Sequence, residues 1–103
     1  MFDDDSDYSY SCLLGACQKY EKSAEIQPNH FELLYNWGNA LIFITKIRSK
    51  DGIKCLPLAC EKFKKALEVK PKDHKCLKNY AVALSRLARL KTGGKFHCNF
   101  FLS

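Results

Sequence analysis

The sequence predicts an all-α protein made of repeated helix pairs, and three observations support this fold class. Three prolines and five glycines among 103 residues leave long stretches in which helices can run uninterrupted. Within those stretches apolar residues recur at the i, i+3, i+4, i+7 spacing of an amphipathic helix. The chain also repeats itself at an offset of 43 residues, so the same kinds of helix are expected to occur twice.

The repeat joins residues 12 to 41 to the residues 43 positions later. Proline recurs at its centre, where Pro28 matches Pro71. The other identical pairs include Cys12 with Cys55, Ala16 with Ala59, Cys17 with Cys60, Leu34 with Leu77, Asn36 with Asn79, Ala40 with Ala83 and Leu41 with Leu84. Conservative pairs are Tyr20 with Phe63, Trp37 with Tyr80 and Gly38 with Ala81.

Four helices are predicted, over residues 8–27, 30–46, 55–70 and 73–91, joined as antiparallel pairs. Leu34, Trp37, Gly38 and Leu41 form one helical stripe of the second helix, and their repeat partners form the same stripe of the fourth. The two matched prolines end the first and third helices, because proline cannot continue the hydrogen-bond ladder and disfavours helix in the residue before it. The segment 48–54, "RSKDGIK", is predicted to be the central loop.

Charge divides the chain into three parts. Residues 1–7 hold four aspartates and are expected to be a disordered acidic start, residues 8–91 form the helical repeat domain, and residues 92–103 form an irregular tail that fits no repeat. The net charge is +6 in spite of those aspartates, so the helical body is strongly basic. The start lacks the basic and apolar regions of a signal peptide, and a cytoplasmic location is expected, with the nucleus as the alternative. In either compartment the six cysteines are expected to be thiols.

These motifs resemble the tetratricopeptide repeat (TPR), whose pattern is W-x2-L-G-x2-Y followed by A-x3-F, an alanine and a proline. "ACEKFKKALEVKP" places Ala59, Phe63, Ala66 and Pro71 on the second half of that pattern, and "LLYNWGNAL" places Gly38 on its glycine. The resemblance covers roughly residues 13 to 88 and implies a short right-handed solenoid of about four helices. The unit of 43 residues is longer than the 34 residues of the family, and HEAT and armadillo repeats are the alternative fold.

The resemblance implies a reason for a glycine inside a helix, where it costs roughly 1 kcal/mol relative to alanine. The two helices of a unit pack so closely that only a small side chain fits where they cross. Gly38 and Ala81 are therefore expected to accommodate Phe63, Tyr20 or their equivalents. Trp37 and Phe63 are both expected to lie in the core.

The resemblance also implies a function, which is to bind a peptide segment of another protein. In this family the first helix of each unit lines a concave groove, in which asparagines hold a peptide backbone and basic residues hold carboxylates. Some members grip the carboxyl-terminal tail of heat-shock chaperones in this way, but this chain matches that set only at Asn36 and Lys75 or, in another alignment, at Asn39 and Asn79. The candidate groove residues are Tyr35, Asn36, Asn39 and Phe43 on the second helix and Lys75, Lys78, Asn79, Val82 and Arg86 on the fourth.

No enzymatic motif is present, since the sequence has no glycine-rich phosphate loop, no G-x-S-x-G and no H-E-x-x-H. Catalytic residues, cofactors and metals are therefore not predicted, and the cysteine pairs are explained by the repeat. No apolar run approaches the ~18 residues that a membrane span needs. Two alternatives to a peptide-binding adaptor remain: a basic nucleic-acid-binding repeat, and a structural piece of a larger array that self-associates.

Overall fold

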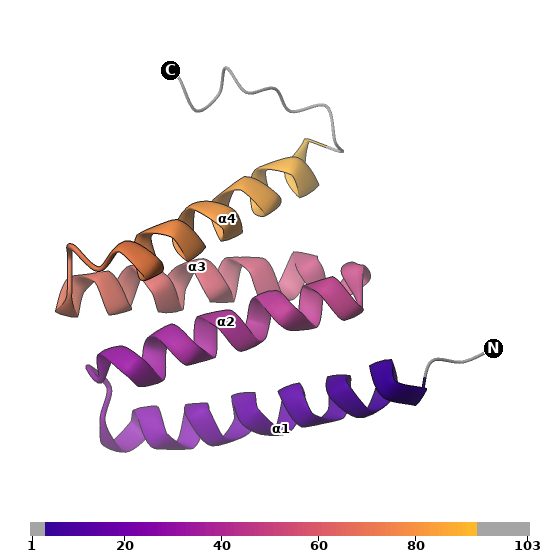
Figure 1. Cartoon of the computed structure of the whole chain (residues 1–103), viewed down its shortest axis with the longest axis horizontal. Coiled ribbons are helices and arrows are strands. Elements are labelled where there is room, and N and C mark those ends of the chain that lie inside the picture. Colours follow the sequence, from indigo (N-terminus) through magenta and orange to yellow (C-terminus); the bar gives the residue numbers. More distant parts are fainter. Residues whose placement is uncertain (1–3, 93–103) are drawn as a thin grey trace.

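Four α-helices follow one another in the computed structural model, which describes residues 4–92. They are α1 (Asp4–Ile26), α2 (Phe31–Ile47), α3 (Gly52–Val69) and α4 (His74–Lys91), and a short 3-10 helix, η1 (Ser49–Asp51), precedes α3 (Figure 1). The described part of the chain contains helices and turns but no strand, which confirms the all-α prediction. Apart from Thr92, which caps α4, the predicted irregular tail lies outside the described residues.

Side-chain caps fix where two of the helices begin. The Nδ1 atom of His30 accepts a hydrogen bond from the backbone N–H of Leu33 at 3.2 Å. A carboxylate oxygen of Asp73 accepts one from the N–H of Cys76 at 2.9 Å. Each bond satisfies one of the amide groups that lack a partner at a helix start. The predicted starts at residues 30 and 73 are therefore the capping residues themselves, and the helices begin one residue later.

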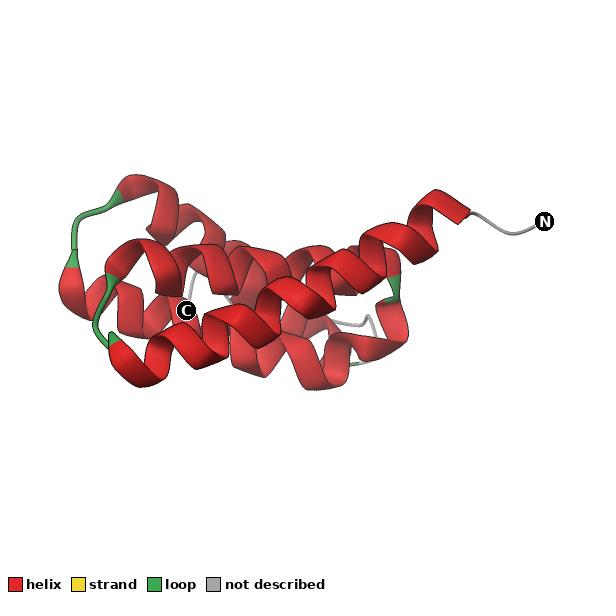
Figure 2. Cartoon of the chain, turned by 90° about the horizontal axis from the view of Figure 1, so that it is seen from below, coloured by secondary structure: helices red, strands yellow, loops and turns green. Residues whose placement is uncertain are grey.

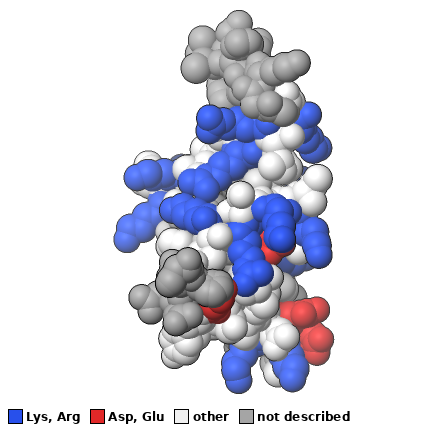
Figure 3. Space-filling view, turned by 90° about the vertical axis from the view of Figure 1, so that its right-hand side faces the viewer, with Lys and Arg blue, Asp and Glu red and all other residues white. Residues whose placement is uncertain are grey.

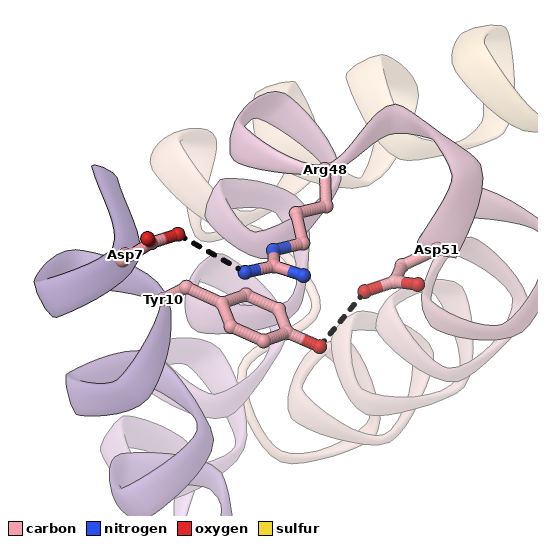
Figure 4. Close-up of polar contacts among 4 residues, drawn as sticks. All are labelled: Asp7, Tyr10, Arg48 and Asp51. Atoms are coloured by element: carbon pink, nitrogen blue, oxygen red, sulfur yellow. Dashed lines mark hydrogen bonds and ion pairs between the residues drawn. The ribbon is translucent and has the colours of Figure 1, made fainter. Parts of the chain in front are cut away.

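Helix α1 begins at Asp4, inside the segment 1–7 that was expected to be disordered. A cluster of contacts attaches its first turns to the α2–α3 connection, as Figure 4 shows. The Arg48 guanidinium lies 3.9 Å from the centroid of the Tyr10 ring and forms an ion pair of 3.2 Å with Asp7. The Tyr10 hydroxyl donates to a carboxylate oxygen of Asp51 at 3.1 Å, and this bond raises the pKa of the tyrosine.

The predicted central loop is also shorter than expected. Of the segment 48–54, only Arg48 lies outside helical structure, since η1 is followed directly by the first turn of α3. Gly52 in that turn is buried, and a methyl group on it would contact side-chain atoms of Leu56 and Leu90 at 3.5 and 3.8 Å. Helix α3 therefore begins three residues earlier than predicted, and Pro57 lies beyond its first turn.

The helices alternate in direction, and each packs against the next one in the sequence (Figure 1). The view from below shows them overlapping along a shared length, with the first turns of α1 projecting beyond the others (Figure 2). Helix α2 also touches α4, so the two helices that carry the candidate groove residues are neighbours. The principal extents of 44, 39 and 19 Å describe a slab about two helices thick.

The core lies mainly between α2 and α3, with α4 covering the far side of α3. Its fully buried members include Phe63, Leu34, Ala59, Ala66, Cys76 and Ala83. The predicted close approach at Gly38 is confirmed, since a methyl group there would lie 2.7 Å from the Phe63 ring. The expectation that Ala81 lies at a similar close approach within the molecule is wrong, because Ala81 is exposed.

Trp37 differs from the prediction that it is a core residue, because it is only partly buried at the edge of the core. The Nζ atom of Lys62 lies 4.0 Å from the centroid of its ring, so the outer face of the indole is covered by a cation rather than by apolar groups. Among the described residues, no helix has the length and apolar character that crossing a membrane requires.

Candidate functional site

The structure brings three of the predicted groove residues together across α2 and α4. The side-chain amide of Asn79 on α4 donates to Asn39 Oδ1 at 2.7 Å and to the Tyr35 hydroxyl at 3.2 Å, both on α2. The three side chains are partly buried, in a medium where such bonds are stronger than in water. We call Tyr35, Asn39 and Asn79 the polar cluster. It links two helices that lie about 40 residues apart in the sequence.

Aromatic contacts hold the polar cluster in position from the core side. The Tyr35 ring stacks on Phe31, with ring centroids 5.8 Å apart and planes within 9°. It also meets Phe63 in a tilted arrangement at 6.1 Å. These contacts fix the direction of the hydroxyl, because the ring has little room to rotate. Both amide hydrogens of Asn79 are used within the cluster, so the group that Asn79 offers to a ligand is its acceptor oxygen.

Basic residues of α4 flank the polar cluster. Lys75 and Lys78 are both exposed and lie one turn and one residue before Asn79, so their ammonium groups are accessible to a ligand on this face. Val82 is half-buried on the same side of the helix. A ligand lying along α4 would therefore meet two positive charges next to a fixed polar surface.

The structure separates Arg86 and Phe43 from that cluster. Arg86 lies nearer the carboxyl end of α4, where it lines a hollow of about 280 Å³ together with Thr45, Gly52 and Leu56. Phe43 is half-exposed on the side of α2 that faces α1, and it borders an apolar hollow of about 430 Å³ with Tyr8, Cys12, Leu13 and Ile47. The predicted nine residues thus occupy a broad face rather than one continuous slot. Asn36 is exposed on α2.

Sequence reasoning missed two features, one on α2 and one at an end of the molecule. Lys46 lies on the exposed side of α2 with its Nζ 5.1 Å from the centroid of the Phe43 ring, and its i+3 spacing from Phe43 could have indicated the contact. Figure 3 shows a second feature, a concentration of basic side chains on the end of the molecule where the α2–α3 connection and the carboxyl end of α4 lie. The basic residues of those segments are Arg48, Lys50, Lys54, Arg86, Arg89 and Lys91.

Four cysteines of the described region are kept as neutral thiols by burial, namely Cys17, Cys55, Cys60 and Cys76. Burial raises the pKa of Cys17 and Cys76 to about 11, and it also raises the pKa of Cys55 and Cys60. Such thiols are poor nucleophiles near neutral pH, because the thiolate is the reactive form. Within residues 4–92, no three side chains of the metal-ligating types lie close enough together to hold an ion.

The chain matches no family model, no curated protein and no solved structure. Its internal repeat and the surface formed by α2 and α4 are therefore the features from which a function can be argued.

Proposed function

We propose that this chain is a helical-repeat module of the tetratricopeptide type that binds an acidic peptide segment of another protein. The peptide lies along the face formed by α2 and α4. The observation that carries the proposal is the polar cluster with Lys75 and Lys78 beside it, because it combines oriented hydrogen-bonding groups with accessible positive charge. On this proposal the module acts as an adaptor or scaffold and catalyses no reaction.

The two parts of the face make different contributions to binding. Phe31 and Phe63 already order the polar cluster, so the free-energy cost of ordering these side chains on peptide binding is small. The exposed Asn36 supplies a donor and an acceptor for a peptide backbone, and the side-chain NH2 group of Asn39 supplies a further donor. Lys75 and Lys78 form charge-assisted hydrogen bonds with carboxylates, which are stronger than neutral ones. Since both lysines are exposed, salt weakens the attraction, and affinity falls as ionic strength rises.

The first prediction tests this face by charge reversal. The double variant Lys75→Glu, Lys78→Glu should lose at least tenfold in affinity for a fluorescein-labelled acidic peptide, measured by fluorescence polarisation, because about 1.4 kcal/mol corresponds to a factor of ten. The matched control is Lys64→Glu, Lys65→Glu, which makes the same change of charge on exposed positions of α3. Circular dichroism should show unchanged helicity in both variants.

The outcome decides between the proposal and its rivals. Equal weakening by the two double variants would mean that the peptide responds only to overall charge, and the α2–α4 site would be rejected. A single-stranded RNA of equal charge serves as a second probe. If the RNA binds more tightly than the peptide, and its binding is abolished in the double variant Arg86→Glu, Arg89→Glu, then the basic end is a nucleic-acid-binding surface and the adaptor function is wrong.

A further inference from the structure

The outer face of α4 leaves a stripe of apolar side chains uncovered. Leu77 and Leu84 are 43% and 41% exposed, and Ala81 between them is also exposed. Their repeat counterparts on α2 lie 43 positions earlier and are Leu34, Gly38 and Leu41. Leu34 and Leu41 are 2% and 5% exposed, and Gly38 is buried. The same stripe is thus covered in one unit of the repeat and open in the other.

Helix α3 is the element that covers the stripe on α2. Its Phe63 ring lies against Gly38, and the alanines on either side, Ala59 and Ala66, are fully buried. Lys62 then places its ammonium group over the Trp37 ring. A helix that covers the α4 stripe in the same manner would carry small residues at the positions equivalent to Ala59 and Ala66. It would carry a large residue at the position equivalent to Phe63, with a lysine directly before it in the sequence.

Helix α1 carries that pattern. The counterparts of the four covering residues of α3 are Ala16, Lys19, Tyr20 and Ser23. Lys19 and Ser23 are exposed and Ala16 is only half-buried, because α2 packs on an adjacent side of α1 and leaves this one open. Among residues 4–92, the two outermost helices therefore leave two surfaces without a helix packed on them, and each is the repeat equivalent of the partner that the other lacks.

We propose that these two surfaces bind each other between copies of the chain, so that α1 of one molecule docks on α4 of the next. The contact repeats the geometry of the α2–α3 interface, with Tyr20 against Ala81 and Lys19 over Tyr80. Since Ala81 is larger than Gly38, the two helices lie slightly farther apart than α2 and α3. This contact uses residues other than the polar cluster and does not depend on the proposed peptide binding.

The charges of the two helices favour this pairing over pairing of like ends. Helix α1 contains five acidic and two basic residues, whereas α4 contains five basic residues and no acidic one. Antiparallel docking, as in α2 and α3, brings the acidic amino-terminal end of α1 to the end of α4 that bears Arg89 and Lys91. Docking of α4 on a second α4 would instead bring two basic helices together, which is unfavourable.

Blocking one surface at a time provides the test. The variant Leu84→Arg removes the α4 surface and Ser23→Arg removes the α1 surface, and each alone should sediment as a monomer at concentrations at which the unmodified chain associates. An equimolar mixture of the two variants should form a one-to-one dimer, because one intact surface of each kind remains. The matched control is Leu58→Arg on α3, where the leucine is 44% exposed and lies in neither surface, and it should associate like the unmodified chain.

Three results would overturn the proposal. If the unmodified chain is monomeric at every concentration, α1 of one molecule does not dock on α4 of the next. Association of Ser23→Arg with itself would show that α4 pairs with α4. A mixture of the two variants that stays monomeric would show that the surfaces do not complement each other. Circular dichroism of each variant, compared with the unmodified chain, verifies that a loss of association is not a loss of fold.

Discussion

Gly38 and Gly15 are both in helix interiors, yet the two glycines have opposite surroundings. A methyl group on Gly38 would lie 2.7 Å from a Phe63 ring that is itself fully buried and cannot move away. A methyl group on Gly15 would meet nothing within 4 Å. The intrinsic helix preference is the same at both positions, so the difference between them isolates the effect of packing.

The substitutions Gly38→Ala and Gly15→Ala should therefore change stability in opposite directions. Gly15→Ala should stabilise by up to about 1 kcal/mol, the gain in helix propensity. At Gly38 the same gain is opposed by overpacking of about 1–3 kcal/mol, and a net loss is expected. Urea denaturation of both variants measures the two effects. If Gly38→Ala is as stabilising as Gly15→Ala, the contact with Phe63 is not tight.

Sequence reasoning located the Gly38 contact because the resemblance to the tetratricopeptide pattern implied the identity of both partners. It failed at Trp37 and Ala81, and the reason is physical. Periodicity shows which residues share a face of a helix, but not how many neighbours that face has. Ala81 lies on the correct stripe of α4, and no described helix covers that stripe. Trp37 lies at the margin of the core, where only Lys62 reaches over its ring.

At the scale of the elements, α1 is attached to the rest of the molecule at its first turns by side chains of the α2–α3 connection. Tyr10 is central to this attachment, because it contacts both Arg48 and Asp51. Among the described helices, α1 packs closely on α2 alone, so the α2–α3 connection gives its first turns a second point of attachment.

Removing one hydroxyl group should loosen those first turns. The variant Tyr10→Phe loses the hydrogen bond to Asp51 but keeps the ring beneath Arg48. A bond of this kind contributes about 0.5–1.5 kcal/mol, which corresponds to roughly two- to tenfold faster amide exchange over residues 4–12. Tyr8→Phe is the control, since Tyr8 is a largely exposed tyrosine two residues away. Equal exchange in both variants would mean that the Asp51 bond does not hold the helix.

The ends of α1 and α3 were predictable from the prolines, but the starts of these two helices were not. Pro28 and Pro71 act on residues next to them, and such local effects can be read from sequence alone. The acidic start becomes helical through contacts with residues 41 positions away, including the pair of Asp7 and Arg48. Four nearby aspartates predict disorder when these contacts are unknown.

For the whole molecule, Phe63 of α3 connects that helix to both α2 and α4. Its ring contacts Gly38 and Tyr35 on α2, and its carbonyl oxygen accepts a hydrogen bond from the Cys76 thiol of α4. Of the predicted groove residues, Tyr35, Asn39 and Asn79 lie in hydrogen-bond contact across α2 and α4. The prediction also placed Phe43 and Arg86 with them, because the sequence does not show how far two helices splay apart.

Truncation of Phe63 should therefore unfold most of the molecule. Phe63→Ala should cost about 3–5 kcal/mol, a large part of the total of about 5–15 kcal/mol for a small domain. Trp37→Ala should cost clearly less, since that ring is only partly buried. Urea denaturation followed by circular dichroism gives both values, and Phe63→Leu provides a milder variant if Phe63→Ala does not fold. Equal losses at the two positions would contradict the core described here.

The sequential packing of the helices has a consequence for how the chain acquires its structure. Each of α2, α3 and α4 packs on the helix that precedes it, and the hydrogen bond from Asn79 to Tyr35 joins residues only 44 positions apart. Contacts of this kind require only short loops to close, so the entropic barrier is low and folding is expected to be fast. As the chain leaves the ribosome, α2 can pair with α1 while α4 is still being synthesised. The packing therefore allows the helices to assemble in the order in which they are translated.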